Sequence, residues 1–218
     1  MSERVQTTVR ADEPISPQGP PDDRLPDLDA EARERRGAAL AQIRTFGDPV
    51  LKSRASEITT FDLELKREAE RMTAIMRDAI GVGLAATQLG VMHRLVVFAA
   101  GPDATATAIA NPEVDWTSEE LAIAEEGCLS LPGVLVEVER PLYARVRGSD
   151  VRGEALTVEA SGLEARVLLH EIDHLDGVLM LDRSARDQRK AALRALREGS
   201  TYSPSSDGSE QGASRAED

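Results

Sequence analysis

The apolar positions of one segment follow the periodicity of an amphipathic helix. Its apolar side chains are spaced four or three residues apart; they are Leu65, Ala69, Met72, Met76 and Ile80. Such spacings place these side chains along one face of a helix. We therefore expect a helix from about residue 62 to 79 that buries this face against a core.

Five short runs rich in β-branched residues lie between Gly, Pro, Asn and Asp residues, as strands do. They read RLVVFAA, TAIANPEV, GVLVEVERP, LYARVRGS and ALTVEAS. Two helical segments follow, SGLEARVLLHEIDHLDG with Ser161 as the expected N-cap, and SARDQRKAALRALRE. Strands grouped between helices without a regular alternation predict an α+β fold with a mainly antiparallel sheet and a C-terminal helix.

Composition separates one core from two polar ends. The chain has 218 residues, of which 41% are hydrophobic, enough for one good-sized core. Residues 1–37 are rich in Pro, Asp, Glu and Arg, and residues 199–218 are acidic and rich in Ser and Gly. Segments of this kind bury too little apolar surface to offset their ordering entropy. We expect both ends to be disordered and a single domain to span residues 38–198.

The net charge of −13 argues against a general attraction to nucleic acid or to an anionic membrane. No run approaches the roughly 18 apolar residues of a membrane span, and MSERVQTTVRADEP at the N-terminus lacks the apolar stretch of a secretory signal. The one cysteine, Cys128, cannot form an intramolecular disulfide. We therefore expect a cytoplasmic protein, monomeric by default, without a membrane partner or a sequence-specific nucleic-acid partner.

The string HEIDH, residues 170–174, is typical of a metal site on a helix. His170 and His174 are four residues apart, so one helical face presents both imidazoles to a single ion. Glu171 lies beside that face, within reach of a water on the metal, and is the expected general base. The same pattern can arise by chance in a charged helix, where the histidines are solvated or hydrogen-bonded.

Two further segments are ambiguous when each is taken alone. GVGLAATQLG contains a G-x-G-x-x-A pattern, but a helix precedes it and a strand is expected after it, the reverse of a dinucleotide-binding turn. It could equally be a helix stop and a turn. In EEGCLSLPG, Cys128 is a candidate third ligand, because thiolates bind metals well and no histidine follows Asp176. A small buried hydrophobe and a nucleophile are the alternatives for a lone cysteine.

The segments GVGLAATQ, EGCLS and HEIDH resemble, in this order, the three signature motifs of the peptide deformylase family. IRTFGDPVLKSRA, residues 43–55, resembles the family's opening segment, so the resemblance covers essentially the whole expected core. It implies an α+β fold with a mainly antiparallel sheet packed around a central metal-binding HExxH helix. It also implies a metal-dependent hydrolase that removes the formyl group from N-formylmethionyl nascent polypeptides and releases formate.

The resemblance assigns roles to individual residues. One divalent ion, Fe²⁺ in most members with Zn²⁺, Ni²⁺ or Co²⁺ as other possibilities, is held by three ligands: Cys128, His170 and His174. Glu171 exchanges protons with the attacking water and the departing amine. The donors to the oxyanion are the side-chain amide of Gln88 and the backbone N–H of Leu129.

The substrate contacts implied by the resemblance lie on two segments. Gly81, Val82 and Gly83 would pair with the peptide as an added strand, since glycine lets a second backbone approach closely. Leu163 and Val167 are candidates for an apolar pocket around the methionine side chain, although core packing explains them equally well. A transient ribosome contact is also implied, for which RDQRKAALRALR is a candidate basic patch; a solvated charged face is the simpler interpretation.

Several other positions bear on the resemblance. The residue before the first metal-binding histidine is often Gln in the family and is Leu169 here. Arg140 and Asp173 are a candidate pair that orients the metal helix, and His93 is interpreted as structural. Two alternatives are weaker, an HExxH zinc peptidase with its usual downstream third ligand, and a catalytically silent relative that binds formylated peptides.

Overall fold

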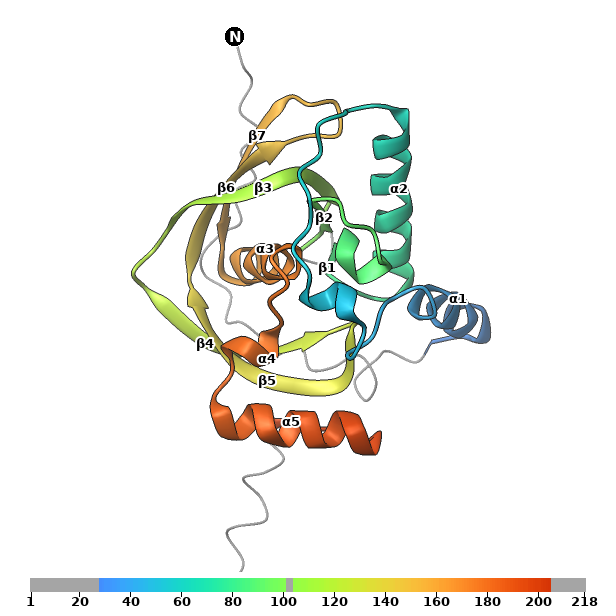
Figure 1. Ribbon diagram of the computed structural model, residues 1–218, viewed down its shortest axis with the longest axis vertical. Helices are drawn as coiled ribbons and strands as arrows, with labels where there is room; N and C mark the ends of the chain where they lie inside the picture. Colours follow the sequence, from blue (N-terminus) through green and yellow to red (C-terminus); the bar gives the residue numbers. More distant parts are fainter. Residues whose placement is uncertain (1–27, 101–103, 205–218) are drawn as a thin grey trace, which may run out of the picture.

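The computed structural model describes residues 28–100 and 104–204 and confirms an α+β fold with mainly antiparallel sheets and a C-terminal helix (Figure 1). Its helices and 3₁₀ helices are α1 (Ala30–Leu40), η1 (Pro49–Lys52), α2 (Leu63–Asp78), η2 (Ala86–Leu89), α3 (Gly162–Leu175), α4 (Met180–Arg183) and α5 (Arg186–Glu198). Its strands are β1 (Gly83–Ala85), β2 (Leu95–Phe98), β3 (Thr107–Thr117), β4 (Leu121–Cys128), β5 (Leu131–Pro141), β6 (Tyr143–Ser149) and β7 (Ala155–Ser161).

Two antiparallel sheets build the β part of the fold. Five strands pair in the order β1-β2-β3-β6-β7, and β4 pairs with β5 in a second sheet. The short strand β1 is therefore an edge of the larger sheet, and among the described residues β4 has β5 as its one strand partner. The helix α3 contacts β1, β2 and β7 of the larger sheet, and α5 packs along β5 (Figure 1).

The predicted amphipathic helix is present as α2. Asp62 caps its start by accepting hydrogen bonds from the backbone N–H groups of Glu64 and Leu65. The apolar stripe is buried up to Met76, but Ile80 lies outside the helix, at a φ of 61°, and is 40% exposed. The expectation for Ile80 is therefore wrong, because the chain leaves the helix there and turns toward β1.

The segment with the HEIDH string forms α3, of which all residues from Arg166 to Leu175 are buried except Leu169. Ser161 occupies the predicted N-cap position, but its side chain makes no capping hydrogen bond. Gly162 follows it with a φ of 54°, a left-handed conformation that favours glycine. This glycine lets the chain turn directly from β7 into the helix.

The structured part of the chain extends past both expected boundaries. Helix α1 begins at Ala30, inside the segment expected to be disordered, and the Asp29 carboxylate caps it through the N–H of Ala32. At the other end Tyr202 pairs with Val134 of β5. The remaining parts of the two polar ends, residues 1–27 and 205–218, lie outside the described residues.

Other elements escaped the sequence analysis. Strand β4 places Glu125 and Glu126 after Leu121 and Ile123 and carries no Val or Thr, so it lacks the β-branched run of the other strands. β1 has three residues, too few for a recognisable alternation. In the described part of the chain, no helix is both long and apolar enough to span a membrane.

Candidate active site

Cys128, His170 and His174 come together at one buried point. Cys128 ends β4, and the two histidines lie one turn apart on α3. Their potential ligand atoms all lie within 4.8 Å of one another, and the Cys128 Sγ is 3.2 Å from the His174 Nε2. The two imidazole rings meet edge to face at 4.9 Å. The structure therefore joins two histidines and a cysteine into a group able to hold a metal ion.

Hydrogen-bond donors surround the Cys128 sulfur. The backbone N–H of Ser130 donates to Sγ at 3.4 Å, and the Gln88 Nε2 lies 3.6 Å from it. The sulfur, the atom through which cysteine binds metals, is therefore held in place by contacts from two elements. Burial lowers the pKa of His174 well below its usual range, so this imidazole is neutral and has a lone pair for a ligand bond.

Glu126 holds His170 from the side away from the cysteine. Its Oε2 lies 3.0 Å from the His170 Nδ1, and its two oxygens accept hydrogen bonds from Arg140 and from Arg166. Burial alone would raise the pKa of Glu126, but the bonds with His170 and Arg140 outweigh burial and hold that pKa well below its usual range. With Nδ1 engaged, the Nε2 of His170 is left to face the cluster.

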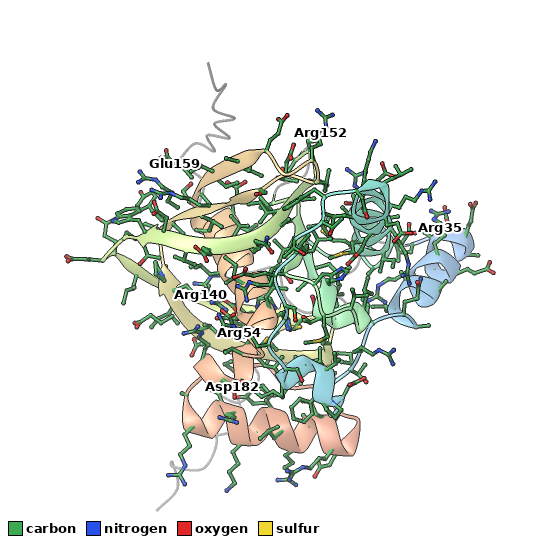
Figure 2. The ribbon with its side chains drawn as sticks, turned by 45° about the horizontal axis from the view of Figure 1, so that its top comes forward. Arg35, Arg54, Arg140, Arg152, Glu159 and Asp182 are labelled. Atoms are coloured by element: carbon green, nitrogen blue, oxygen red, sulfur yellow. The ribbon has the colours of Figure 1, made fainter. Side chains whose placement is uncertain are left out.

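The predicted pair of Arg140 and Asp173 is confirmed as a contact. The Arg140 Nη1 donates to the Asp173 Oδ2 at 2.9 Å, and the Arg183 Nε donates to the same oxygen at 2.9 Å. Arg140 therefore bridges Glu126 and Asp173, and Figure 2 shows it in the interior beside α3, whereas Arg35 and Arg152 lie at the surface. This pair was predicted from the sequence, whereas the contacts of Glu126 and Arg166 were not.

Glu171 has a different environment from its helical neighbours. Burial raises its pKa to about 7, against the lowering effect of His170 and Arg140. Its Oε2 is buried and has no hydrogen-bond partner among the described residues. The carboxylate lies directly against the Cα of Gly83, so that a Cβ there would overlap Oε1. Gly83 thus makes room for Glu171, a role that the sequence analysis did not foresee.

Gln88 and Leu129 flank the cysteine from two different elements. Gln88, on η2, is 2% exposed, and its Oε1 accepts the backbone N–H of Ala85 at 2.9 Å. This bond turns its Nε2 toward the Ser130 Oγ, 3.2 Å away, and toward Cys128. Leu129 follows Cys128, and its side chain packs so closely on Gly81 that a Cβ there would lie 2.9 Å from Leu129 Cδ1.

The structure gives the predicted substrate-binding residues two kinds of surroundings. Val82 is 36% exposed and precedes the edge strand β1. Val167 is buried in an apolar cluster between α3 and the larger sheet, and Leu163 packs against that cluster. His93 lies elsewhere and pairs with Glu68 of α2 at 2.8 Å, in keeping with a structural role.

Comparisons with known proteins agree on one family. A family model described as polypeptide deformylase matches residues 40–190. A peptide deformylase from Parafrankia sp. (strain EAN1pec) is 44% identical over 160 residues, covering 73% of this chain and 87% of the relative. One from Thermotoga neapolitana is 49% identical over 144 residues, covering 66% and 87%. The crystal structure of a peptide deformylase from Synechococcus elongatus in complex with actinonin aligns with a TM-score of 0.68 at 36% identity, covering 73% and 88%.

The region matched by the family model contains the segments GVGLAATQ, EGCLS and HEIDH together with the buried group of one cysteine and two histidines. The observed fold, α+β with mainly antiparallel sheets, is also that of the aligned structures. The chain therefore belongs to the peptide deformylase family, hydrolases that remove the N-terminal formyl group from nascent polypeptides.

Proposed function

We propose that this chain deformylates N-formylmethionyl peptides at one divalent metal ion held by Cys128, His170 and His174. The observation that carries the proposal is the meeting of these three ligand atoms within 4.8 Å, with the Glu171 carboxylate on the same helix. The helix α3 is then the central metal-binding helix of a single catalytic domain, which we place at residues 38–198.

The residues present fit such an ion. One thiolate and two imidazoles make three protein ligands, the number found in catalytic sites that keep a fourth position for water or substrate. Glu126 occupies the Nδ1 of His170, which leaves Nε2 as the nitrogen available for a ligand bond. All three side chains are buried, so the ion would be shielded from bulk water.

The proposed ion is Fe²⁺, as the family resemblance implies, with Zn²⁺, Ni²⁺ or Co²⁺ as alternatives. A mixed thiolate and imidazole site binds several of these ions, so availability in the cell contributes to the choice. When bound, the ion would polarise the formyl oxygen and make a water molecule acidic enough to attack near neutral pH.

Glu171 is the proposed proton carrier. Its Oε2 is buried and without a hydrogen-bond partner among the described residues, so it is free to accept a proton from the attacking water. The same carboxyl group then delivers that proton to the departing amine. Contact with Gly83 limits the positions that the carboxylate can adopt.

Gln88 and Leu129 are the proposed donors to the formyl oxygen as it gains negative charge. The bond from the Ala85 N–H to Oε1 holds the Gln88 amide with its Nε2 near Cys128. The backbone N–H of Leu129 directly follows the cysteine along the chain. Two fixed donors next to the reacting carbon are the arrangement that stabilises a developing oxyanion.

The edge of β1 is the proposed binding site for the peptide backbone. This edge, with Gly81, Val82 and Gly83, has no strand partner other than β2 in the described part of the chain. An extended peptide can add to such an edge through main-chain hydrogen bonds. Leu163 and Val167 remain the proposed contacts for the methionine side chain, in addition to their core contacts.

We further propose that the protein acts in the cytoplasm as a monomer and contacts the ribosome transiently through α5. Five basic side chains of α5 are exposed although the chain is acidic overall: Arg186, Arg189, Lys190, Arg194 and Arg197. A cationic stripe of this kind is attracted to RNA phosphates. Cosedimentation with ribosomes that weakens as salt rises supports this contact, whereas salt-independent cosedimentation, or none, contradicts it.

An anaerobic assay of formate release from formyl-Met-Ala-Ser tests the proposed function. Protein loaded with Fe²⁺ should release formate, a chelator should stop the reaction, and added Fe²⁺ should restore it. Acetyl-Met-Ala-Ser serves as the matched control for the acyl group. A folded, metal-loaded protein that releases no formate would rule out the proposal, and Cys128→Ser with undiminished metal content would remove Cys128 from the ligand set.

A further inference from the structure

The strand pair that carries Cys128 is bulged next to the cysteine. Gly127 pairs with Leu135, but the next residue, Cys128, pairs with Leu131. One step along β4 therefore spans four positions along β5, and residues 132–134 are left over as a bulge. Bulges redirect a side chain locally, so the shape of this one sets the direction of the Cys128 sulfur.

The segment that follows α5, residues 201–203, binds this bulge. The backbone N–H of Tyr202 donates to the carbonyl of Gly133 at 2.9 Å, and the N–H of Leu135 donates to the carbonyl of Tyr202 at 2.8 Å. These two bonds lie on either side of Val134. Gly133 has a φ of 74°, and a Cβ there would lie 3.2 Å from Thr201 Cγ2, so glycine permits the close approach.

The same segment also contacts β4. The Ser203 hydroxyl donates to the Glu125 Oε1 at 2.9 Å, and Glu125 directly precedes Glu126, the residue that holds His170. The Tyr202 side chain packs against the apolar cluster that contains Cys128. The C-terminal segment thus contacts both strands that meet at the cysteine.

Helix α5 leads into residues 201–203 and positions them beside β5. The helix packs along β5 and ends at Gly199, whose φ of 65° turns the chain, and the N–H of Ser200 closes the end by bonding to Ala195 (Figure 1). The segment lies after the region of residues 40–190 that the family model matches.

We propose that residues 201–203 are a positioning element that fixes the bulge beside Cys128 and so sets the place of its sulfur and of the Leu129 N–H. The proposal rests on the proposed metal and oxyanion roles of these two residues. Without the segment, the bulge loses the two backbone bonds to Tyr202, and the cysteine loses part of its cover.

The test compares a chain ended at Ser200 with a chain ended at Pro204, both of which keep the α5 cap. Cys128 is the only cysteine, so the rate at which Ellman's reagent reacts with the metal-free protein reports on this sulfur alone. Loss of two backbone hydrogen bonds should raise that rate about tenfold in the shorter chain. With Fe²⁺ bound, kcat should fall while KM for formyl-Met-Ala-Ser changes little.

Two variants of the full chain guard against a folding defect. Ser203→Asp places a second carboxylate against Glu125 and should raise the thiol reaction rate, whereas Ser203→Asn keeps a donor and should leave it near that of the unaltered chain. Equal thiol rates in both chain lengths and both variants would overturn the proposal. The thiol assay needs neither metal nor turnover, so this result is distinct from a failure of the proposed deformylation.

Discussion

Two buried carboxylates beside the group of Cys128, His170 and His174 have contrasting environments. Glu126 and Glu171 are 5% and 4% exposed, so burial alone does not distinguish them. Arg140, Arg166 and His170 bind Glu126, and its pKa lies well below the usual range. Glu171 keeps one oxygen without a partner among the described residues, and its pKa is raised to about 7.

The two environments suit two different roles, orienting a ligand and exchanging a proton. A carboxylate fixed as an anion orients a ligand, while one that exchanges a proton near neutral pH serves as acid and base. The helical geometry of α3 allows both, because His170 and Glu171 are neighbours in sequence and point about 100° apart around the helix axis. One helix thus presents His170 to Glu126 and directs the Glu171 carboxylate toward Gly83.

The largest expected effect comes from Glu171→Gln, which keeps the shape but cannot carry a proton. We expect kcat for formyl-Met-Ala-Ser to fall by about 10²–10⁴-fold. Metal content should stay close to that of the unaltered protein, because Oε2 makes no bond that the amide would break. A variant that keeps its full rate, or one that loses its metal, would contradict the proposed role of Glu171 as proton carrier.

Glu126→Gln should have the opposite profile. The change leaves the buried Arg166 without its carboxylate partner and Arg140 with Asp173 alone, so the free energy of unfolding should fall by about 3–5 kcal/mol. The weaker hold on His170 should lower metal affinity by about 10–100-fold. Chemical denaturation and metal titration measure the two effects.

Glu159→Gln is the matched control for Glu126→Gln. Glu159 pairs with Arg145 at the surface, so its loss should change the free energy of unfolding by less than about 1 kcal/mol. If both variants had the same stability and metal affinity as the unaltered protein, the inference that Glu126 orients His170 would be wrong.

The difference between local and long-range contacts also explains what the sequence predicted. The spacing of His170 and His174 within one helix is local, so the pair could be recognised before any fold was known. The contact between Glu126 and His170 joins residues 44 positions apart and depends on β4 reaching α3. No pattern in the sequence points to that pairing, although a ligand histidine generally needs such a partner.

Ile80 and Tyr202, whose predicted surroundings were wrong, also depend on contacts outside their own segments. Ile80 continues the apolar spacing of α2, and only the turn toward β1 removes it from the helix. Tyr202 lies in a polar, Ser-rich segment whose composition predicts disorder, but its backbone bonds to β5 require no apolar side chains. The composition of a segment does not predict backbone pairing with a distant strand.

A smaller effect tests the packing that confines Glu171. Gly83→Ala would place a methyl group where the carboxylate lies, so Glu171 must move. We expect kcat to fall by about 10–100-fold, since small displacements of a catalytic group are costly. Gly81→Ala should lower kcat less, because the added methyl group meets the flexible end of the Leu129 side chain. Gly37→Ala has open space around its Cβ and should leave kcat unchanged; equal rates in all three would contradict the contact.

The smallest effect concerns a third carboxylate, which resembles Glu171 in burial but lies outside the metal cluster. Glu164 is 6% exposed, its Oε2 has no partner among the described residues, and burial raises its pKa from 4.5 to about 6. Because the folded state favours the protonated form, the stability that this gives is present in full below pH 4.5 and is lost as the pH rises through about 6.

Glu164→Gln cannot ionise and should avoid this loss. After allowance for partial solvent contact, its free energy of unfolding should exceed that of the unaltered protein by about 1 kcal/mol above pH 7, with a smaller difference at pH 5. Urea denaturation at both pH values measures this, with Glu159→Gln as the exposed reference. A difference that does not grow with pH would mean that an unpartnered oxygen in this fold has no energetic cost, and the contrast between Glu126 and Glu171 would then need another cause.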